Sequence, residues 1–405
     1  MLVMLGTQRF LRSIQLRNLL SFGPETSELE LKALNVLIGP NGSGKSNLLE
    51  AISLLQAAPR NLLDPIQAGG GVGDLLWKGA DRPTAEINVI VDNPQGKIPL
   101  RHRLSLTMVA QRLEIVDESI ENESPDPAKE QDDVYFYYRY QQGRPVLNVK
   151  TSLPMVPRAR RELRREDLPV DQSVLSQRKD PDQYPEVTYL GRQYANLKLY
   201  REWSLGRRAE PRRPQPADTE SDFLREDASN LALVLNELEH TSNLRGDLVE
   251  KLRIADDAIA DFSTRVHGGT IQLFLHYRGL SSPVPVTRLS DGTIRYLCLL
   301  AILCHPHPPP LVCLEEPELG LHPDLLPSLA SLLIEASHRV QLIVTTHSDT
   351  LVDALSHVPE AVVVCEKVEG CSQMRRTSPE ELSDWLTTYG LGQLWRRGDI
   401  GGNRW

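Results

Sequence analysis

The chain has 405 residues, which is enough for a large buried core and for two or three lobes. Hydrophobic residues make up 40% and charged residues 24%, as in globular proteins, and the longest apolar run, 296–304, is far too short to span a bilayer. The formal net charge of −9 argues against a strongly basic nucleic-acid binder, although net charge does not exclude local basic patches.

The N-terminus and the cysteines indicate the compartment. Residues 1–10 lack the basic start, apolar stretch and cleavage site of a signal peptide. The five cysteines fit neither a disulfide framework nor a paired metal site, and we interpret them as reduced core thiols. We therefore expect a cytoplasmic protein with no membrane partner.

The first elements in the chain are predicted strands that lead to a glycine-rich loop. Partial alternation predicts strands at 13–22 and 29–31, and the apolar run 34–38 predicts a buried strand. Helical spacing of apolar residues then predicts a helix over 47–58, which Pro59 ends.

The loop between that strand and that helix is Gly39-Pro-Asn-Gly-Ser-Gly-Lys45-Ser46, which matches G-x-x-x-x-G-K-[ST] at every fixed position. The glycines let backbone N–H groups point at phosphate oxygens, Lys45 would reach the β- and γ-phosphates, and Ser46 would supply an oxygen to Mg²⁺. ATP and Mg²⁺ are the expected cofactors. The expected nucleotide-binding residues here are Gly39, Pro40, Asn41, Gly42, Ser43, Gly44, Lys45, Ser46 and Asn47.

The middle of the chain predicts a β-rich region and then helices. Strand-like stretches between 85 and 150 predict an antiparallel sheet, interrupted by the acidic run 117–133, which we expect to be a loop or a helix. Arg- and Pro-rich stretches at 153–182 and 205–220 indicate surface loops. Apolar spacing through 222–266, including Ile259 and Phe262, predicts a helical subdomain.

From Leu289 onward, predicted strands and helices alternate. Apolar strands at 311–314, 341–344 and 361–365 are interleaved with helices at 292–304, 322–336 and 350–355. This alternation predicts a largely parallel sheet covered by helices.

Polar residues stand at the ends of two of these strands. A carboxylate at a strand tip beside a phosphate loop can hold Mg²⁺, and a second one can accept a proton from the attacking water. We assign Glu315 to the metal and Glu316 to the water, the alternative being a solvated acidic loop. His347 follows the next strand and could donate to the γ-phosphate, although a lone histidine is usually structural.

Leu289-Ser290-Asp291-Gly292 precedes an apolar helix. Ser290 can cap that helix and Gly292 permits the close approach of a phosphate, but taken alone the segment is also an ordinary helix N-cap.

The order of these four segments resembles that of the RecF/SMC-like branch of ABC ATPases. The chain is most similar to the small stand-alone bacterial predicted AAA/ABC-type ATPases of that branch. Four stretches support this resemblance, namely 14–22, 315–323, 345–348 and 382–402. Two positions depart from the pattern, since Glu315 stands where Asp is usual and Thr293 where Gln or Glu is usual.

The resemblance implies an α/β ABC-ATPase head with a P-loop mixed/parallel sheet, an antiparallel β subdomain, a helical subdomain and no long coiled coil. We divide this head into five parts. The first three are an N-terminal lobe with the P-loop (1–83), a β-rich region with charged inserts (84–221) and a helical subdomain (222–268). The last two are a C-terminal lobe (269–375) and a helical C-terminal segment (376–405).

The resemblance also implies a mechanism. Two heads would form a homodimer around two ATP molecules, with Ser290 and Gly292 of one head touching the γ-phosphate held by the other. Glu316 would activate water and His347 would support the γ-phosphate.

The expected function is an ATP-hydrolysing, ATP-gated head dimer in DNA maintenance or anti-phage defence, with DNA and a partner nuclease or effector as candidate partners. The basic run 158–165, helped by arginines at 207–208, 212–213 and 396–397, could add salt-dependent affinity for DNA, but such runs are usually solvated faces. Two alternatives remain, namely a nucleotide-binding subunit of an ABC transporter and a slowly hydrolysing ATP-dependent clamp.

Overall fold

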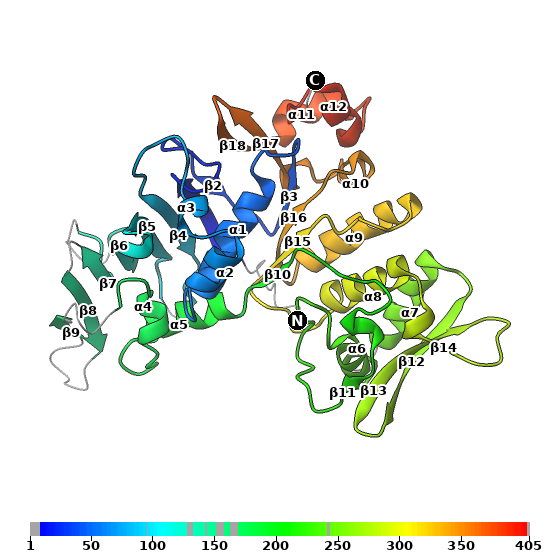
Figure 1. Cartoon of the computed structure of the whole chain (residues 1–405). Helices are drawn as coiled ribbons and strands as arrows, with labels where there is room; N and C mark the ends of the chain where they lie inside the picture. The colour runs from blue at the N-terminus through cyan, green and yellow to red at the C-terminus, as the bar shows by residue number, and fades with distance from the viewer. Residues whose placement is uncertain are drawn as a thin grey trace.

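The computed structural model describes residues 9–94, 96–127, 133–141, 144–150, 158–162, 169–240 and 244–402. Within these ranges the chain forms three sheets with helices packed against them, and the sheets follow one another across an elongated molecule (Figure 1). The predicted α/β fold, including an antiparallel sheet and a largely parallel one, is confirmed.

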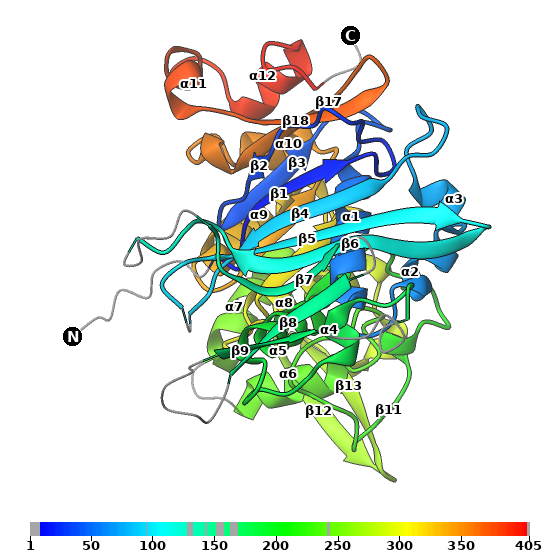
Figure 2. The same ribbon diagram turned by 90° about the vertical axis from the view of Figure 1, so that its left-hand side faces the viewer.

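The antiparallel sheet has the strand order β2-β1-β4-β5-β6-β7-β8-β9 (Figure 2). Helix α5 (Pro185–Ala195) packs between this sheet and helix α1 (Lys45–Ala57), beside the short helices α2 (Leu63–Ala68), α3 (Val72–Leu75) and α4 (Val174–Gln177). The strands are β1 (Leu11–Arg17), β2 (Leu29–Glu30), β4 (Ala85–Val91), β5 (Leu100–Val109), β6 (Arg112–Asn122), β7 (Phe136–Gln141), β8 (Arg144–Lys150) and β9 (Arg158–Glu162).

The second sheet has the order β10-β15-β16-β3-β17-β18 and is parallel except at its last pair. Its two faces contact different cores. In β3, Leu34, Val36 and Ile38 face the core beneath the C-terminal helices, while Leu37 faces the core shared with α1 and the antiparallel sheet. Burial on both faces explains why these strands read as continuous apolar runs. The strands are β3 (Leu34–Ile38), β10 (Lys198–Tyr200), β15 (Leu311–Glu315), β16 (Gln341–Thr345), β17 (Val362–Val368) and β18 (Cys371–Arg376).

The third sheet lies at the far end of the molecule and contains β11 (Gln215–Pro216), β12 (Ile259–His267), β13 (Thr270–Tyr277) and β14 (Val284–Pro285). No helix in the described ranges exceeds the 13 residues of α1 and α8, so these residues form no long coiled coil. The same helices include none that is long and apolar enough to cross a membrane. The helices not yet placed are α6 (Leu231–His240), α7 (Leu244–Ala255), α8 (Asp291–Leu303), α9 (Leu326–Ser337), α10 (Asp349–Asp353), α11 (Pro379–Leu386) and α12 (Leu391–Arg397).

The prediction of helix through residue 266 was wrong at its end, because Ile259 and Phe262 lie on β12. The pairing of β12 with β13 shifts register between Ile259 and Asp261, so one extra residue is inserted there. That bulge places Ile259 and Phe262, three residues apart, in the same core, and a spacing of three is also what one face of a helix gives.

Two more differences concern the region 84–221. Residues 117–122, predicted as a loop or a helix, continue strand β6. The buried carboxylate of Glu118 is tolerated there because it accepts hydrogen bonds from Val174 N (2.9 Å) and the Ser173 hydroxyl. Strand β10 also falls in this region, yet it pairs with β15 of the parallel sheet. Three residues are too few for periodicity to reveal such a strand.

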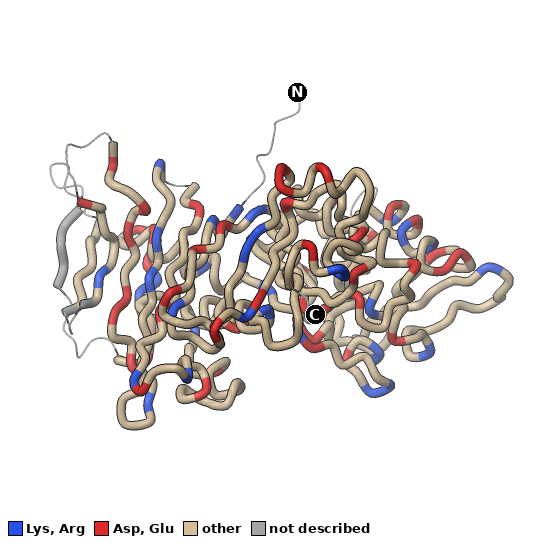
Figure 3. The backbone as a smooth tube through the Cα atoms, turned by 90° about the horizontal axis from the view of Figure 1, so that it is seen from above, with Lys and Arg blue, Asp and Glu red and all other residues tan. Residues whose placement is uncertain are grey.

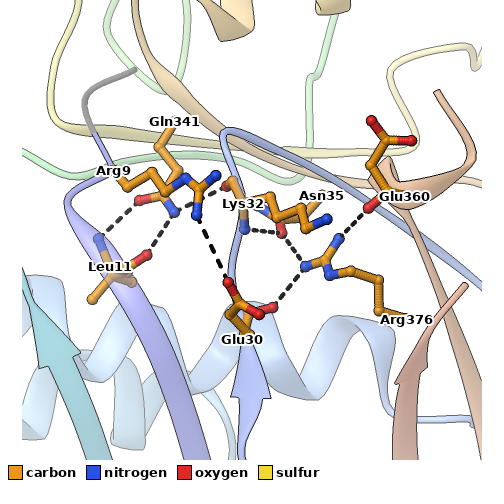
Figure 4. A network of polar contacts seen from close by, with 8 residues as sticks. All are labelled: Arg9, Leu11, Glu30, Lys32, Asn35, Gln341, Glu360 and Arg376. Atoms are coloured by element: carbon orange, nitrogen blue, oxygen red, sulfur yellow. Dashed lines mark hydrogen bonds and ion pairs between the residues drawn. The ribbon is translucent and has the colours of Figure 1, made fainter. Parts of the chain in front are cut away.

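A polar clamp joins the antiparallel sheet to the parallel one (Figure 4). Gln341, which is fully buried at the start of β16, accepts from Leu11 N at 2.8 Å and donates to Leu11 O at 2.7 Å. Buried Asn35 of β3 accepts from Lys32 N at 2.8 Å and from Arg376 Nη2 at 2.6 Å. Burial lowers the pKa of Arg376 to about 10, which still leaves the guanidinium charged at neutral pH. The two sheets are thus fixed by side-chain hydrogen bonds as well as by apolar packing.

Replacing Gln341 by Leu is expected to lower the free energy of unfolding by about 2–4 kcal/mol, because the buried N–H and C=O of Leu11 each lose a partner. Chemical denaturation followed by circular dichroism measures the loss. Gln373→Leu is the matched control, since Gln373 is exposed on β18. Equal losses in the two variants would show that the clamp adds no specific stability.

Candidate functional site

The glycine-rich loop connects buried β3 to α1, and its shape depends on close contacts. A Cβ at Gly39 would lie 2.2 Å from Cys365 O, and one at Gly44 would lie 2.4 Å from Ser372 Oγ. Both glycines also have positive φ, 149° and 105°. Gly44 is the N-cap of α1 and offers no side-chain cap, so the N–H groups of the first turn stay available to an anion.

The polar residues of this loop point in several directions. Lys45 is 5% exposed and donates from Nζ to Gly39 O at 2.7 Å and Pro40 O at 3.1 Å. Burial lowers the pKa of Lys45, while neighbouring acidic groups, including Glu316 and Glu315, oppose that shift. Asn47 donates from Nδ2 to Ser21 Oγ at 2.6 Å, which braces α1 against the loop after β1.

Glu315 ends β15 and has a partner on each carboxylate oxygen. Oε1 accepts from the Ser46 hydroxyl, and Oε2 accepts from Arg201 Nε at 3.1 Å. Arg201 also pairs with Glu50 of α1. Burial alone would lower the pKa of Arg201, but the hydrogen bonds to Glu50 and Glu315 raise it. The positive charge of Arg201 therefore pairs with the carboxylates of both Glu50 and Glu315, beside Ser46.

Sequence reasoning missed Arg201, because its partners lie far from it in the chain. It follows the short strand β10, which pairs with β15 and so delivers the guanidinium to Glu315. The pattern that could have revealed it is a polar residue directly after the apolar pair Leu199-Tyr200, at the end of another short strand.

Glu316 and His347 meet because β15 and β16 are parallel neighbours, with Glu315 paired to Thr345. Glu316 Oε1 lies 3.7 Å from His347 Nε2. Glu316 has φ 45°, and its N–H donates to Thr345 O at 3.0 Å. A non-glycine residue in this region costs roughly 1–2 kcal/mol, and such strain gathers at functional sites.

Glu318 organises the segment that carries His347. Its Oε1 accepts from Thr346 Oγ1 at 2.5 Å and from His347 N at 3.0 Å. Its Oε2 is buried without a hydrogen-bond partner among the described residues. Burial raises the pKa of Glu318, although these hydrogen bonds act in the opposite direction. In the sequence, Glu318 fell only within the supporting stretch 315–323, which did not show this contact.

Ser290 and Gly292 lie at the start of α8. Ser290 Oγ accepts from Thr293 N at 3.1 Å, as expected of a helix cap. A Cβ on Gly292 would lie 2.6 Å from Gly320 O, so this glycine is needed for contact with the loop after Glu318. In the described part of the chain, no hydrogen bond or ion pair joins Ser290 or Gly292 to the loop 39–47.

The arginines proposed for DNA binding differ in their surroundings. The backbone of Arg158–Glu162 forms β9, while its side chains and residues 163–165 lie outside what the structure describes. Arg212 is 4% exposed and donates to Leu289 O at 2.7 Å, so it supports the segment before α8 and is not a surface cation. Along the described chain, basic and acidic residues are interspersed (Figure 3).

Comparison with protein families gives a match over most of the chain. Residues 34–353 match the family described as "AAA domain, putative AbiEii toxin, Type IV TA system". This span runs from β3 to the end of α10, so it includes all the residues assigned above to nucleotide, metal and water.

Two solved head structures share the fold. The SmcHead bound to the C-winged helix domain of ScpA aligns with a TM-score of 0.57 at 13% identity, covering 92% of this chain and 99% of that one. An Smc head domain with an extended coiled coil, bound to the C-terminal domain of ScpA and derived from Pyrococcus furiosus, gives 0.54 at 13% identity, covering 93% and 98%. At this identity the likeness shows the fold.

Curated proteins with sequence similarity include the "Chromosome partition protein Smc" of two bacteria. That of Desulfitobacterium hafniense (strain Y51) is 37% identical over 101 residues, and that of Bacillus subtilis (strain 168) is 31% identical over 105 residues. The matches cover 23% and 24% of this chain but only 8% of each relative, so the chain corresponds to a small part of those proteins.

Glu318 makes stability depend on pH in a definite direction. Its pKa is raised above the ordinary 4.5, so its contribution is fully present below that value and is lost as the pH rises through the folded-state pKa. Glu318→Gln cannot titrate. The free energy of unfolding of the wild type, relative to this variant, is therefore expected to fall as the pH rises from below 4.5 to above it.

Denaturation curves across that pH range, with exposed Glu369→Gln as the control variant, test this expectation. A wild-type advantage that stays constant over the range would show that the pKa of Glu318 is not raised.

Proposed function

Because the chain belongs to the AAA-domain family that matches residues 34–353 and is an ATP-binding, SMC/RecF-like ATPase of the ABC type, we propose that it hydrolyses ATP as a molecular switch. Two heads would close on two ATP molecules and open after hydrolysis. The observation that carries this proposal is the approach of Glu316 to His347, at 3.7 Å, beside the glycine-rich loop.

The residues present suit ATP with Mg²⁺. The first turn of α1 offers backbone donors, Lys45 adds a positive charge, and the buried Ser43 hydroxyl has no hydrogen-bond partner among the described residues. Ser46 and Glu315 offer the hard oxygen ligands that Mg²⁺ prefers, and they are already in contact. When bound there, Mg²⁺ would neutralise charge on the phosphate oxygens.

Glu316 and His347 would act on the γ-phosphate side of the site. Glu316, at the end of a buried strand, would accept the proton of the attacking water, and His347 would donate to a γ-phosphate oxygen. Glu318 would hold the His347 backbone through the 3.0 Å hydrogen bond, so that the imidazole keeps its position opposite Glu316.

Closure by a second copy would give Ser290 and Gly292 a task. In one chain they contact the α8 cap and the Gly320 loop, and not the loop 39–47. A face-to-face homodimer would place them against the ATP held by the partner copy, where the N-terminus of α8 favours an anion.

The cellular role that we propose is DNA maintenance or anti-phage defence, carried out through DNA or a partner nuclease or effector. Support comes from the family description, which names a toxin of a toxin–antitoxin system, and from the chromosome-partition name of the sequence relatives. A slowly hydrolysing clamp and a transporter subunit remain the competing functions. The number of ATP molecules hydrolysed during the lifetime of one dimer distinguishes a clamp from a switch.

Replacing Glu316 by Gln is expected to leave ATP binding intact and to lower turnover by about 10²-fold or more, because the general base is lost. The variant should then accumulate as a dimer in ATP and Mg²⁺. Light scattering gives the solution mass, and phosphate release gives turnover.

Glu369→Gln is the matched control, because Glu369 is an exposed glutamate that also has positive φ, at 50°. Adding Ser290→Arg to Glu316→Gln should prevent the dimer while ATP still binds. Normal turnover in Glu316→Gln would remove Glu316 from its role, and a dimer that tolerates Ser290→Arg would exclude the α8 face from the interface.

A further inference from the structure

The C-terminal segment 390–402, here called the tail, lies beside the nucleotide-binding loop although it ends the described chain. It contains α12 and a last turn with Gly398 at φ 87°. Helices α11 and α12 lie next to α10, β17 and β18 (Figure 1). The sequence resemblance singled out residues 382–402, which include this segment, and the proposed function gives it no role.

One end of the tail contacts the helix that follows His347. A Cβ on Gly392 of α12 would lie 2.0 Å from Asp349 O, so the two helices touch backbone to backbone. Arg396 Nη2 pairs with Asp349 Oδ2 at 2.5 Å. Asp349 is the first residue of α10, and Ser348, its N-cap, comes directly after His347. The tail therefore holds the helix that positions the His347 loop.

The other end of the tail contacts the start of the glycine-rich loop. Gly402 N donates to Glu366 Oε1 at 2.8 Å, and Gly402 O accepts from the buried indole nitrogen of Trp395 at 2.9 Å. A Cβ on Gly402 would lie 3.6 Å from Gly39 Cα and 2.7 Å from Val364 Cγ1. Gly39 in turn offers its carbonyl to Lys45 Nζ. The end of the tail thus packs on the residue that anchors Lys45.

We propose that the tail is a positioning element that fixes the His347 loop relative to the glycine-rich loop. The two loops follow β16 and β3, which are neighbouring strands of the parallel sheet. Trp395 links the ends of the tail, since it belongs to α12 and holds Gly402. This inference rests on the proposed function, because both loops matter only if the site binds and hydrolyses ATP.

The placement of the two ends separates two effects. A shift of α10 moves His347, which acts on hydrolysis, whereas a shift at Gly402 moves Gly39 and Lys45, which act on binding. A displacement near 1 Å can cost about 10²-fold in rate. The added methyl group would lie 2.0 Å from Asp349 O in Gly392→Ala and 2.7 Å from Val364 Cγ1 in Gly402→Ala, so each must shift the tail, whereas 3.6 Å to Gly39 Cα is ordinary contact.

The test measures binding of a fluorescent ATP analogue and single-turnover hydrolysis of ATP in the full chain. Gly392→Ala is expected to lower the hydrolysis rate at least about tenfold, with the dissociation constant within about twofold of wild type. Gly402→Ala is expected to raise the dissociation constant at least about tenfold.

Matched controls are Gly246→Ala on α7 and Gly268→Ala at φ 58°, because an added Cβ meets nothing within 4 Å at either site. Trp395→Phe serves as a second variant if an alanine variant fails to fold, since it keeps a ring but loses the hydrogen bond to Gly402. It should weaken analogue binding in the same direction as Gly402→Ala.

Two results would overturn the tail's role. In the first, the alanine variants behave like their controls. In the second, they lose binding and hydrolysis together, in proportion to the loss of folded protein. A wild type that binds the analogue but never hydrolyses ATP would contradict the proposed function alone, and the binding comparison of Gly402→Ala with Gly268→Ala would still decide the inference.

Discussion

The parallel pairing of β15, β16 and β3 is the constraint on which the candidate site depends. In a parallel sheet every strand ends at the same edge, so the residues that follow these three strands come together without contact along the chain. The register aligns Glu315 with Thr345 and Thr345 with Leu37. The glycine-rich loop, the two glutamates and His347 therefore share one edge of the sheet, although about 300 residues separate the first from the others.

The clamp at Gln341 lies at the opposite end of β16 from His347. It joins Leu11 and Lys32, in the segment before β3, to the start of β16. The clamp and the candidate site thus lie at opposite ends of β16. The unusual backbone of Glu316, at φ 45°, lies at the end of the sheet away from the clamp.

The predictable part of the fold is the part with local signals. Unbroken apolar runs predicted the central strands because both faces of each strand are buried, and the family resemblance drawn from motif order is confirmed by the match over residues 34–353. The assignment of roles to Glu315, Glu316 and His347 stays a prediction, although the structure brings these residues together.

The unpredictable part depends on contacts between distant segments. Arg201 reaches Glu315 only through the pairing of the three-residue strand β10, and Arg212, which resembled a surface charge, is buried against the carbonyl of Leu289. The bulge in β12 gave a strand the spacing of a helix. In each case the deciding interaction is tertiary, so neither composition nor periodicity carries it.

The contact between Gly292 and Gly320 O has a consequence for two ATP sites in one assembly. A methyl group at Gly292 would lie 2.6 Å from that carbonyl, so the start of α8 packs directly against the loop after Glu318. In the proposed homodimer, ATP held by one head would contact Ser290 of the other head. That contact would shift the Gly320 loop of the second head, which leads back to its Glu316. Occupancy of one site would then alter the readiness of the other, which is cooperativity transmitted through a backbone contact rather than through a hinge.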